Sequence, residues 1–394
     1  MPITPRERLQ QFGRLFQEEM FPRLEAETGP LSELGRLLVK VLGMVALGRH
    51  IAVGRGWRGR PTQDRRALAA AFIAKSIYGI ETTRQLIERL RSDRQMRCLC
   101  GWNSRQQVPH ESTFSRAFAE FAQSELPQRL HEALIGATQQ ERLIGHICRD
   151  STAIEARERF DTMPIHAPLP GREHKRRGRP RKSERLLPTK RLPRQRQQTV
   201  AEMLRELPRY CSLGVRTTGG GNQRYWRGYK LHIDVADGQL PISCLLTAAS
   251  VHDSQVAIPL ATITAQRVTS LYDLMDSAYD ANEIYEHSRS LGHVPLIALN
   301  GALPPVTSLP HQDSLRHYDR RRRRPQRYTR KRPPLTPAQV ERYKLRTMSE
   351  RVNSRLKDEF GARTVRVRGA HKVMAHLMFG VLALTVDQLL RLTG

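Results

Sequence analysis

The amino-acid sequence predicts an α/β fold, in which a mixed sheet flanked by helices follows an all-helical N-terminal region. Before residue 140, apolar residues recur at helical spacing with few β-branched runs. From about residue 143, short runs with strand character alternate with helical segments. With 394 residues, the chain is long enough for two or three domains that each bury a core.

The N-terminal region contains several segments with helical periodicity. Residues 31–47 and 66–90 carry apolar residues at helical spacing. In residues 109–121, polar residues that favour a helix start precede three phenylalanines spaced along one helix. This arrangement fits a helix-turn-helix, and it fits an ordinary helical hairpin equally well.

Five strands are expected after residue 143. The second and third are joined at Asp237-Gly238, a strong short hairpin signal. We expect the strands within residues 143–154, 229–250 (two strands), 270–281 and 294–300, and helices within 253–266 and 280–292. Three strands, a helix and two further strands flanked by helices is the order of an RNase H-like core.

The charge balance indicates a polyanionic partner. Lys and Arg number 66 against 38 Asp and Glu, so the formal net charge is +28. Each phosphate that a basic side chain neutralises releases counterions, which adds affinity independent of nucleotide sequence. Nucleic acid is therefore the leading candidate, ahead of a membrane surface or of a basic protein without such a partner.

The cysteines and apolar segments favour a reducing interior. Five cysteines without a C-x-x-C pair indicate neither a disulfide framework nor a zinc finger. The N-terminus lacks the layout of a signal peptide, and the apolar run Leu377–Val386 is too short to cross a bilayer. We expect a cytoplasmic, nucleoid-associated protein without a membrane partner.

Two strongly basic segments interrupt the expected core. Residues 171–197 hold 12 Lys or Arg against two Glu, and residues 316–332 hold 10 against one Asp. Both are too charged to pack as core, so each is expected to be flexible on its own. Arg177-Gly-Arg-Pro180 fits an arm inserted in a DNA minor groove or a general phosphate contact. The expected DNA-contacting residues of this segment are Arg176, Arg177, Arg179, Arg181 and Lys182.

These features suggest four divisions of the chain. They are a helical domain for DNA binding or dimerisation at 1–140, a catalytic domain at 141–300 and 335–394, a basic insertion at 160–222, and an Arg-rich linker at 301–334.

Two aspartates at strand ends are candidates for phosphodiester chemistry. Asp150 closes the first strand and Asp276 closes the fourth, and these strands are neighbours in an RNase H-like sheet. Carboxylates on rigid, converging elements suit the divalent ions that such chemistry requires. The alternative is that each ends a strand or caps a helix. We assign Asp280 to a capping box with Glu283, and Asp273 lies inside the strand.

A third carboxylate lies on a predicted helix near the C-terminus. Thr336-Pro-Ala-Gln339 is a helix-start pattern and Gly361 a helix stop, which predicts one helix of about 23 residues. At about 100° per residue, one polar stripe holds Tyr343, Arg346, Glu350 and Lys357, and the opposite face holds Leu345, Met348, Val352 and Leu356. The pattern alone also fits a solvated amphipathic helix.

The spacing in YKLRTMSERVNSRLK matches the Y-R-E-K signature, and on this basis the chain resembles the DDE insertion-sequence transposases. RDST around Asp150, DSAYD around Asp276 and the tail VRVRGAHKVMAHLMFGVLAL also look like this family. So does the region around YGIETTRQLIERL and HESTFSR, which precedes the catalytic core. The resemblance covers residues 60–394. It departs in one respect: the 74-residue interval between Asp276 and Glu350 lacks a long β-rich insertion.

The resemblance implies that Asp150, Asp276 and Glu350 are the catalytic and metal-binding triad. Mg2+ is the expected cofactor, and Mn2+ is expected to substitute. The implied reaction is cleavage of a bacterial insertion sequence at its ends, followed by joining of the 3′-hydroxyl to target DNA. Tyr343, Arg346 and Lys357 would contact double-stranded DNA. A homodimer on DNA is expected, and no small-molecule substrate. Alternatives are a metal-dependent nuclease without strand transfer and a catalytically silent DNA-binding descendant.

Four further residues have two interpretations each. His252 and Asp253 resemble a family motif and could line the site, or Asp253 could cap the next helix. Tyr225 and Trp226 could stack on an unpaired base, or they could be aromatic residues of an edge strand.

Overall fold

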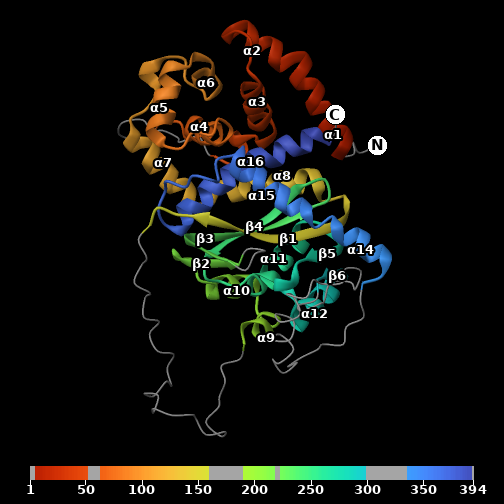
Figure 1. Cartoon of the computed structure of the whole chain (residues 1–394). Helices are drawn as coiled ribbons and strands as arrows, with labels where there is room; N and C mark the ends of the chain where they lie inside the picture. Colours follow the sequence, from red (N-terminus) through yellow and green to blue (C-terminus); the bar gives the residue numbers. More distant parts are fainter. Residues whose placement is uncertain (1–4, 52–62, 159–189, 218–221, 299–334, 393–394) are drawn as a thin grey trace, which may run out of the picture.

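The computed structural model describes residues 5–51, 63–158, 190–217, 222–298 and 335–392. Figure 1 shows a helical region above a central sheet, with the C-terminal helices between them and shorter helices below the sheet. The chain therefore has the α/β architecture that the sequence predicts.

The helical region precedes the sheet in sequence. Its α-helices are α1 (Pro5–Leu15), α2 (Phe21–Thr28), α3 (Glu33–Val45), α4 (Arg65–Ile77), α5 (Thr83–Ser92), α6 (Arg94–Leu99), α7 (Glu111–Gln123) and α8 (Leu126–Gln139). Residues 66–90 form two helices, because the chain turns at Gly79, whose φ of +61° suits glycine. The His110 ring accepts a hydrogen bond from the Ser112 N–H and so caps α7, as the segment's pattern predicts.

The sheet has the strand order of an RNase H-like core. Its strands are β1 (Leu143–Glu155), β2 (Ser212–Thr217), β3 (Gln223–Ala236), β4 (Leu240–Ala248), β5 (Thr269–Met275) and β6 (Val294–Ile297). β3 pairs antiparallel with both β1 and β4, whereas β1 pairs parallel with β5 and β5 with β6. The five predicted strands thus lie in the order β4-β3-β1-β5-β6. The predicted hairpin at Asp237-Gly238 joins β3 to β4.

β2 was not predicted. It pairs antiparallel with the first part of β3, from Gly228 back to Gln223, beside the stretch that pairs with β4. β2 and this part of β3 form a ribbon that extends the sheet, called the β2–β3 ribbon below. Of this ribbon, β2 lies within residues 160–222, the region predicted as a basic insertion.

The helices after β4 agree with the prediction except at one cap. α11 (Ser254–Arg267) packs on β3 and β4, and α12 (Asn282–Ser290) packs beside β6. The capping box predicted from Asp280 is wrong, since the N-cap of α12 is Ala281 and no side chain caps it. The turn after β5 carries the chain past Asp280 before the helix begins.

The single helix predicted between Thr336 and Gly361 is two helices. α14 (Pro337–Lys344) begins with the predicted capping box at Thr336, and α15 (Thr347–Asp358) follows after a turn at Leu345 and Arg346. The turn leaves the Leu345 side chain 40% exposed, so the predicted apolar face is buried only in its later part, at Val352 and Leu356. This part of α15 packs on β1 and β3.

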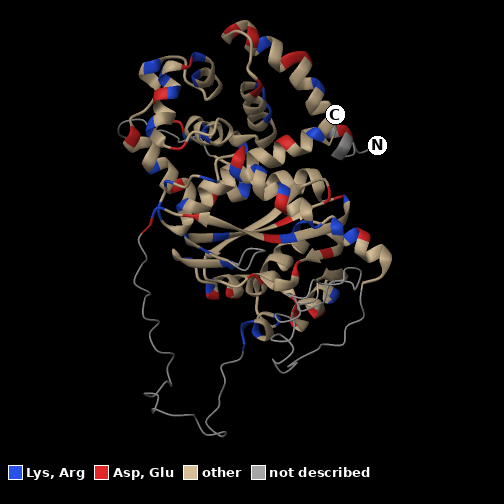
Figure 2. Ribbon diagram, viewed as in Figure 1, with Lys and Arg blue, Asp and Glu red and all other residues tan. Residues whose placement is uncertain are grey.

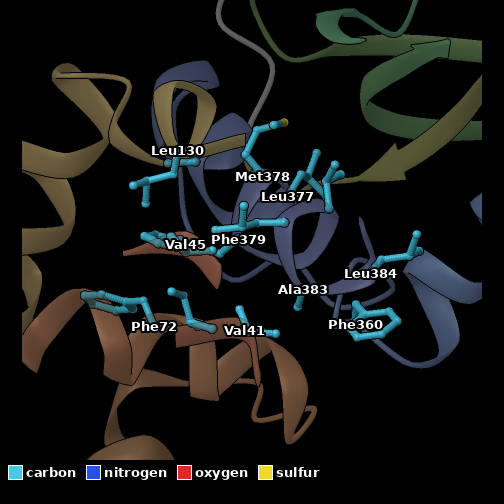
Figure 3. Close-up of a cluster of buried hydrophobic side chains, with 14 of the residues drawn as sticks. Val41, Val45, Phe72, Leu130, Phe360, Leu377, Met378, Phe379, Ala383 and Leu384 are labelled. Atoms are coloured by element: carbon cyan, nitrogen blue, oxygen red, sulfur yellow. The ribbon is translucent and has the colours of Figure 1, made fainter. Parts of the chain in front are cut away.

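The last helix, α16 (Ala370–Arg391), crosses the middle of the molecule. It packs against α3, α4, α7 and α8 on one side and β4 on the other. Figure 3 shows Phe379 of α16 near Phe72 of α4, and their rings stack at 6.0 Å. α16 is long and apolar enough to span a membrane, but 83% of its most apolar window is buried inside the protein. It is therefore a core helix.

Part of the predicted basic insertion belongs to the packed fold. α9 (Arg191–Gln195) and α10 (Val200–Glu206) both pack on α11, and Gln195 is buried. The other basic stretches fall in residues 159–189 and 299–334, outside the described residues.

Candidate functional site

Asp150 and Asp276 are carried by neighbouring strands. The prediction that Asp150 closes the first strand is wrong, because β1 continues to Glu155, paired with β3, whereas its pairing with β5 ends at Arg149. β1 and β5 run parallel, and Arg149 pairs with Met275, so Asp150 and Asp276 each follow this pair in their strands. Asp276 directly follows β5 and accepts a hydrogen bond from the Ala278 N–H at 2.9 Å. The structure thus brings Asp150 and Asp276 together.

Both carboxyl groups are harder to ionise than an ordinary aspartate. Burial and the nearby Asp276 charge raise the pKa of Asp150 from 3.8 to about 6. Burial and the Asp253 charge likewise raise the pKa of Asp276. A bound cation would relieve the cost of holding these charges together.

Asp253 is a third carboxylate close to the pair. Its Oδ1 atom accepts a hydrogen bond from the Lys230 ammonium at 2.9 Å, and the Ser151 hydroxyl also donates to it. Burial alone would raise the pKa of Asp253, but His232 and Lys230 outweigh burial and lower it. Burial lowers the pKa of His232 to about 4, so at neutral pH Lys230 supplies the positive charge.

Asp253 lies close to Asp150 and Asp276, which is compatible with its interpretation as a site-lining residue. It occupies the N-cap position of α11, but its side chain makes no capping hydrogen bond. His252 is exposed, bonds Ser254 at 2.8 Å and lowers the pKa of Asp276, so it lies at the edge of the same site.

Glu350 points toward Arg346 rather than toward the aspartates. Its Oε1 atom accepts a hydrogen bond from the Arg346 guanidinium at 2.8 Å, and its side chain is 54% exposed. Arg346 lies close enough to oppose the rise in the pKa of both Asp150 and Asp276. The half-buried Tyr343 hydroxyl also contacts Arg346. Among the described residues, no three His, Cys, Asp or Glu side chains form a group that could hold a metal ion.

The α15 residue that reaches the aspartates is Asn353. Its Nδ2 atom donates a hydrogen bond to Asp150 Oδ2 at 3.2 Å, and its side chain is only 7% exposed. Asn353 follows Glu350 by three residues, so it lies one turn along α15 toward the sheet. Asn353 was not among the predicted site residues, although its position one turn after Glu350 is a signal in the sequence.

A buried ion pair supports the opposite side of β1. Arg149 and Asp234 are both almost fully buried, and a guanidinium nitrogen lies 2.7 Å from Asp234 Oδ2. Thr264 of α11 donates to the same oxygen. Asp273, inside β5 as predicted, is buried and bonded to Ser288 and His293. Arg149 Nε and Asp234 Oδ1 have no hydrogen-bond partner among the described residues, but the charges of the buried pair balance each other, so we assign these groups to the fold.

Lys357 lies in a basic cluster at the far end of α15. Arg363 and, on the β2–β3 ribbon, Arg216 and Arg224 are close enough, with burial, to lower the pKa of Lys357. Arg216 and Arg224 are directly opposite each other across the ribbon. Their like charges are unfavourable together, and an exposed ion pair of Arg224 with Glu155 at 3.6 Å offsets this only in part.

The remaining candidates separate into buried, exposed and undescribed residues. Trp226 is buried and donates a hydrogen bond to the Tyr229 carbonyl, so it belongs to the sheet. Tyr225 remains 56% exposed on the ribbon. Arg176, Arg177, Arg179, Arg181 and Lys182 lie outside the described residues.

Comparison with known families identifies the family of the sheet and its flanking helices. The family model described as "Transposase DDE domain" matches residues 144–386, which is more than half of the chain. The chain belongs to the DDE transposases. A second model, "Transposase domain (DUF772)", matches residues 26–120 of the helical region of the transposase. No curated protein and no solved structure gives a significant match.

Membership in the family carries several general properties. DDE transposases are polynucleotidyl transferases or nucleases that bind DNA and use a divalent metal. The donors at the site suit such a metal: Asp150 and Asp276 are hard oxygen ligands, and their raised pKa values indicate carboxylates that lack a neutralising partner.

Proposed function

We propose that the transposase cleaves the ends of an insertion sequence and joins the exposed 3′-hydroxyl to target DNA. Asp150, Asp276 and Glu350 would hold Mg2+, or Mn2+ in its place. The observation that carries this proposal is the proximity of Asp150 and Asp276, whose negative charges repel each other. The second support is the match to the transposase DDE domain. When bound, the metal activates an oxygen nucleophile and stabilises charge on the scissile phosphate.

Glu350 joins the pair only after a change of side-chain position. Arg346 holds it now through a single hydrogen bond between a partly exposed and an exposed group, which is worth little. We infer that phosphate competes with Glu350 for Arg346. The carboxylate is then released to turn toward Asp150, while Arg346 and Tyr343 position the DNA strand.

The DNA path follows from the charge distribution. Figure 2 shows acidic and basic residues interspersed along the described helices and strands. Residues 52–62, 159–189 and 299–334 carry 22 of the 66 Lys and Arg residues but only 5 of the 38 Asp and Glu residues. We propose that Arg176, Arg177, Arg179, Arg181 and Lys182 add general phosphate contacts, and that the Lys357 cluster guides the strand near the active site. Synapsis of two ends on a homodimer in the bacterial cytoplasm completes the proposal.

Asp150→Asn, Asp276→Asn and Glu350→Gln test the triad. Each change is expected to reduce end cleavage by orders of magnitude, because a metal ligand is removed, and to leave DNA binding nearly intact. The assays are Mg2+-dependent nicking of a labelled element end, joining of precut ends to a target, and gel-shift binding without metal. Near wild-type cleavage by Asp276→Asn would show that another carboxylate is the second metal ligand, and Asp253 would be the next residue to test. Cleavage without any joining by the wild type would favour a nuclease.

A further inference from the structure

Asn353 is an unusual residue for its position. Its side chain is almost fully buried between α15 and β1, where an apolar residue would pack without polar groups to satisfy. Its Nδ2 atom has a partner in Asp150 at 3.2 Å, but its Oδ1 atom is buried without a hydrogen-bond partner among the described residues. A buried, unpaired acceptor costs stability, so its presence needs an explanation.

The chemistry of an amide explains it. A Lys or Arg at this place would neutralise Asp150 and compete with a cation, whereas an apolar residue would leave the carboxylate free to rotate. An amide N–H fixes one carboxylate oxygen and leaves the negative charge in place. The amide oxygen Oδ1 lies in the same buried surroundings and accepts no hydrogen bond from the described residues. A water molecule bound to a cation at Asp150 could donate that hydrogen bond.

We propose that Asn353 is a positioning residue of the metal site, which orients the Asp150 carboxylate through Nδ2 and accepts a hydrogen bond from cation-bound water through Oδ1. The inference rests on the proposed role of Asp150 as a metal ligand. It explains why α15 carries a polar residue on its buried face next to Val352 and Leu356, which are apolar there.

Asn353→Leu separates this role from packing, because leucine has nearly the same size and shape without donors or acceptors. Removal of groups that orient a metal ligand typically weakens metal binding 10- to 100-fold. We therefore expect the affinity of the full-length protein for Mn2+, measured by titration calorimetry, to fall about 10- to 100-fold. Excess Mn2+ should restore most of the cleavage rate, since only the binding of metal is weakened.

Stability gives the second readout. In EDTA, the thermal midpoint of Asn353→Leu is expected to stay near that of the wild type, because removal of the unpaired acceptor offsets the absence of the hydrogen bond. Asn353→Ala, which also removes the amide but cannot overfill the site, should show the same decrease in Mn2+ affinity. Ser349→Ala is the matched control: Ser349 is as deeply buried on the same helix, but its hydroxyl bonds to the Arg346 carbonyl of its own helix. It should bind Mn2+ as the wild type does.

The outcomes distinguish two kinds of failure. If Asp150→Asn loses Mn2+ binding while both Asn353 variants keep wild-type affinity, the role of Asn353 is overturned and the metal site stands. If Asp150→Asn itself binds Mn2+ like the wild type, the proposed metal ligand is wrong and the role of Asn353 is overturned with it. A decrease in affinity that Ser349→Ala shares would assign the effect to helix packing and also overturn the inference.

Discussion

The carboxylates of the site differ in how their charges are balanced. Asp253 has a dedicated cation in Lys230, and Glu350 has Arg346, whereas Asp150 receives hydrogen bonds from an amide and from the Ser151 backbone. Asp276 receives one from a backbone N–H. Neutral donors orient a carboxylate without cancelling its charge. Asp150 and Asp276 are therefore the groups with most to gain from a divalent cation.

Asp150 should make the metal-free protein less stable as the pH rises. The folded protein holds the Asp150 proton up to a pKa of about 6, against 3.8 for an ordinary aspartate. This contribution to stability is complete below pH 3.8 and is lost between pH 3.8 and 6. Relative to the wild type, Asp150→Asn should therefore gain on the order of 3 kcal/mol in unfolding free energy between pH 3.5 and pH 8.

Urea denaturation in EDTA at several pH values measures this gain. Glu88→Gln is measured at the same pH values as the control for removing one carboxylate, because Glu88 is exposed on α5 in the helical region. A pH-independent difference for Asp150→Asn would mean that Asp150 ionises in the folded protein as it does in the unfolded chain.

Elements with a strong internal pattern could be predicted from the sequence. The alternating strands, the Asp237-Gly238 hairpin and α11 all have local signals, and the structure confirms them. β2 lacks such a signal, because it is a short strand with exposed Leu213 and Val215 and is held by its pairing with β3. The turn between α14 and α15 contains neither Gly nor Pro, so the helical pattern continues across it.

The site was predictable only where strand order determines it. The predicted adjacency of the first and fourth strands places Asp150 and Asp276 together, although Asp150 lies inside β1 and not at its end. The partners of these residues depend on tertiary packing. Asn353 is 203 residues from Asp150 in sequence, and only its position one turn after Glu350 points to the site. The sequence also did not decide whether Glu350 pairs with Arg346. The same i,i+4 spacing fits a salt bridge between them, or a metal contact by Glu350 and a separate phosphate contact by Arg346.

The β2–β3 ribbon and the end of α15 should bind DNA together. Arg216 and Arg224 oppose each other and lie near Lys357, an arrangement that a phosphate would stabilise. We expect Lys357→Ala and the double variant Arg216→Gln/Arg224→Gln to weaken DNA binding. The slope of log affinity against log salt should flatten by about 0.9 for each phosphate that the variant no longer neutralises. The rate of joining of precut ends should decrease together with the DNA affinity, while the affinity for Mn2+ is unchanged.

Fluorescence anisotropy across a salt series measures the slope. Arg289→Gln is the matched control, since Arg289 is an exposed arginine near the end of α12, on a different part of the molecule. Slopes identical to the wild type for both ribbon and Lys357 variants would show that this cluster meets no phosphate.

At the scale of the molecule, one buried cluster runs from the helical region through α16 into the sheet. It includes Leu38 of α3, Phe114 of α7, Val381 of α16 and Ile233 of β3. Glu81 of the helical region also binds Arg366, close to the start of α16. Because the packing is continuous, we expect the helical region and the catalytic core to unfold together. We also expect DNA bound by the helical region to keep a fixed position relative to the catalytic core.

Phe379→Ala tests this continuity. Phe379 is 1% exposed, and its ring packs on Phe72 of α4 and Phe118 of α7, at centroid distances of 6.0 and 6.4 Å. Such a truncation typically costs about 3–5 kcal/mol. Trp102, buried in the helical region, and Trp226, buried in the sheet, can each report unfolding in variants that retain only that tryptophan. We expect both tryptophans to report one shared denaturation midpoint, and both midpoints to shift together in Phe379→Ala.

Leu34→Ala is the control and should change neither midpoint, because Leu34 is 43% exposed on α3. A shift reported by Trp102 alone would show that the helical region unfolds independently, and that the catalytic core is stable without the packing of α16 on α4 and α7.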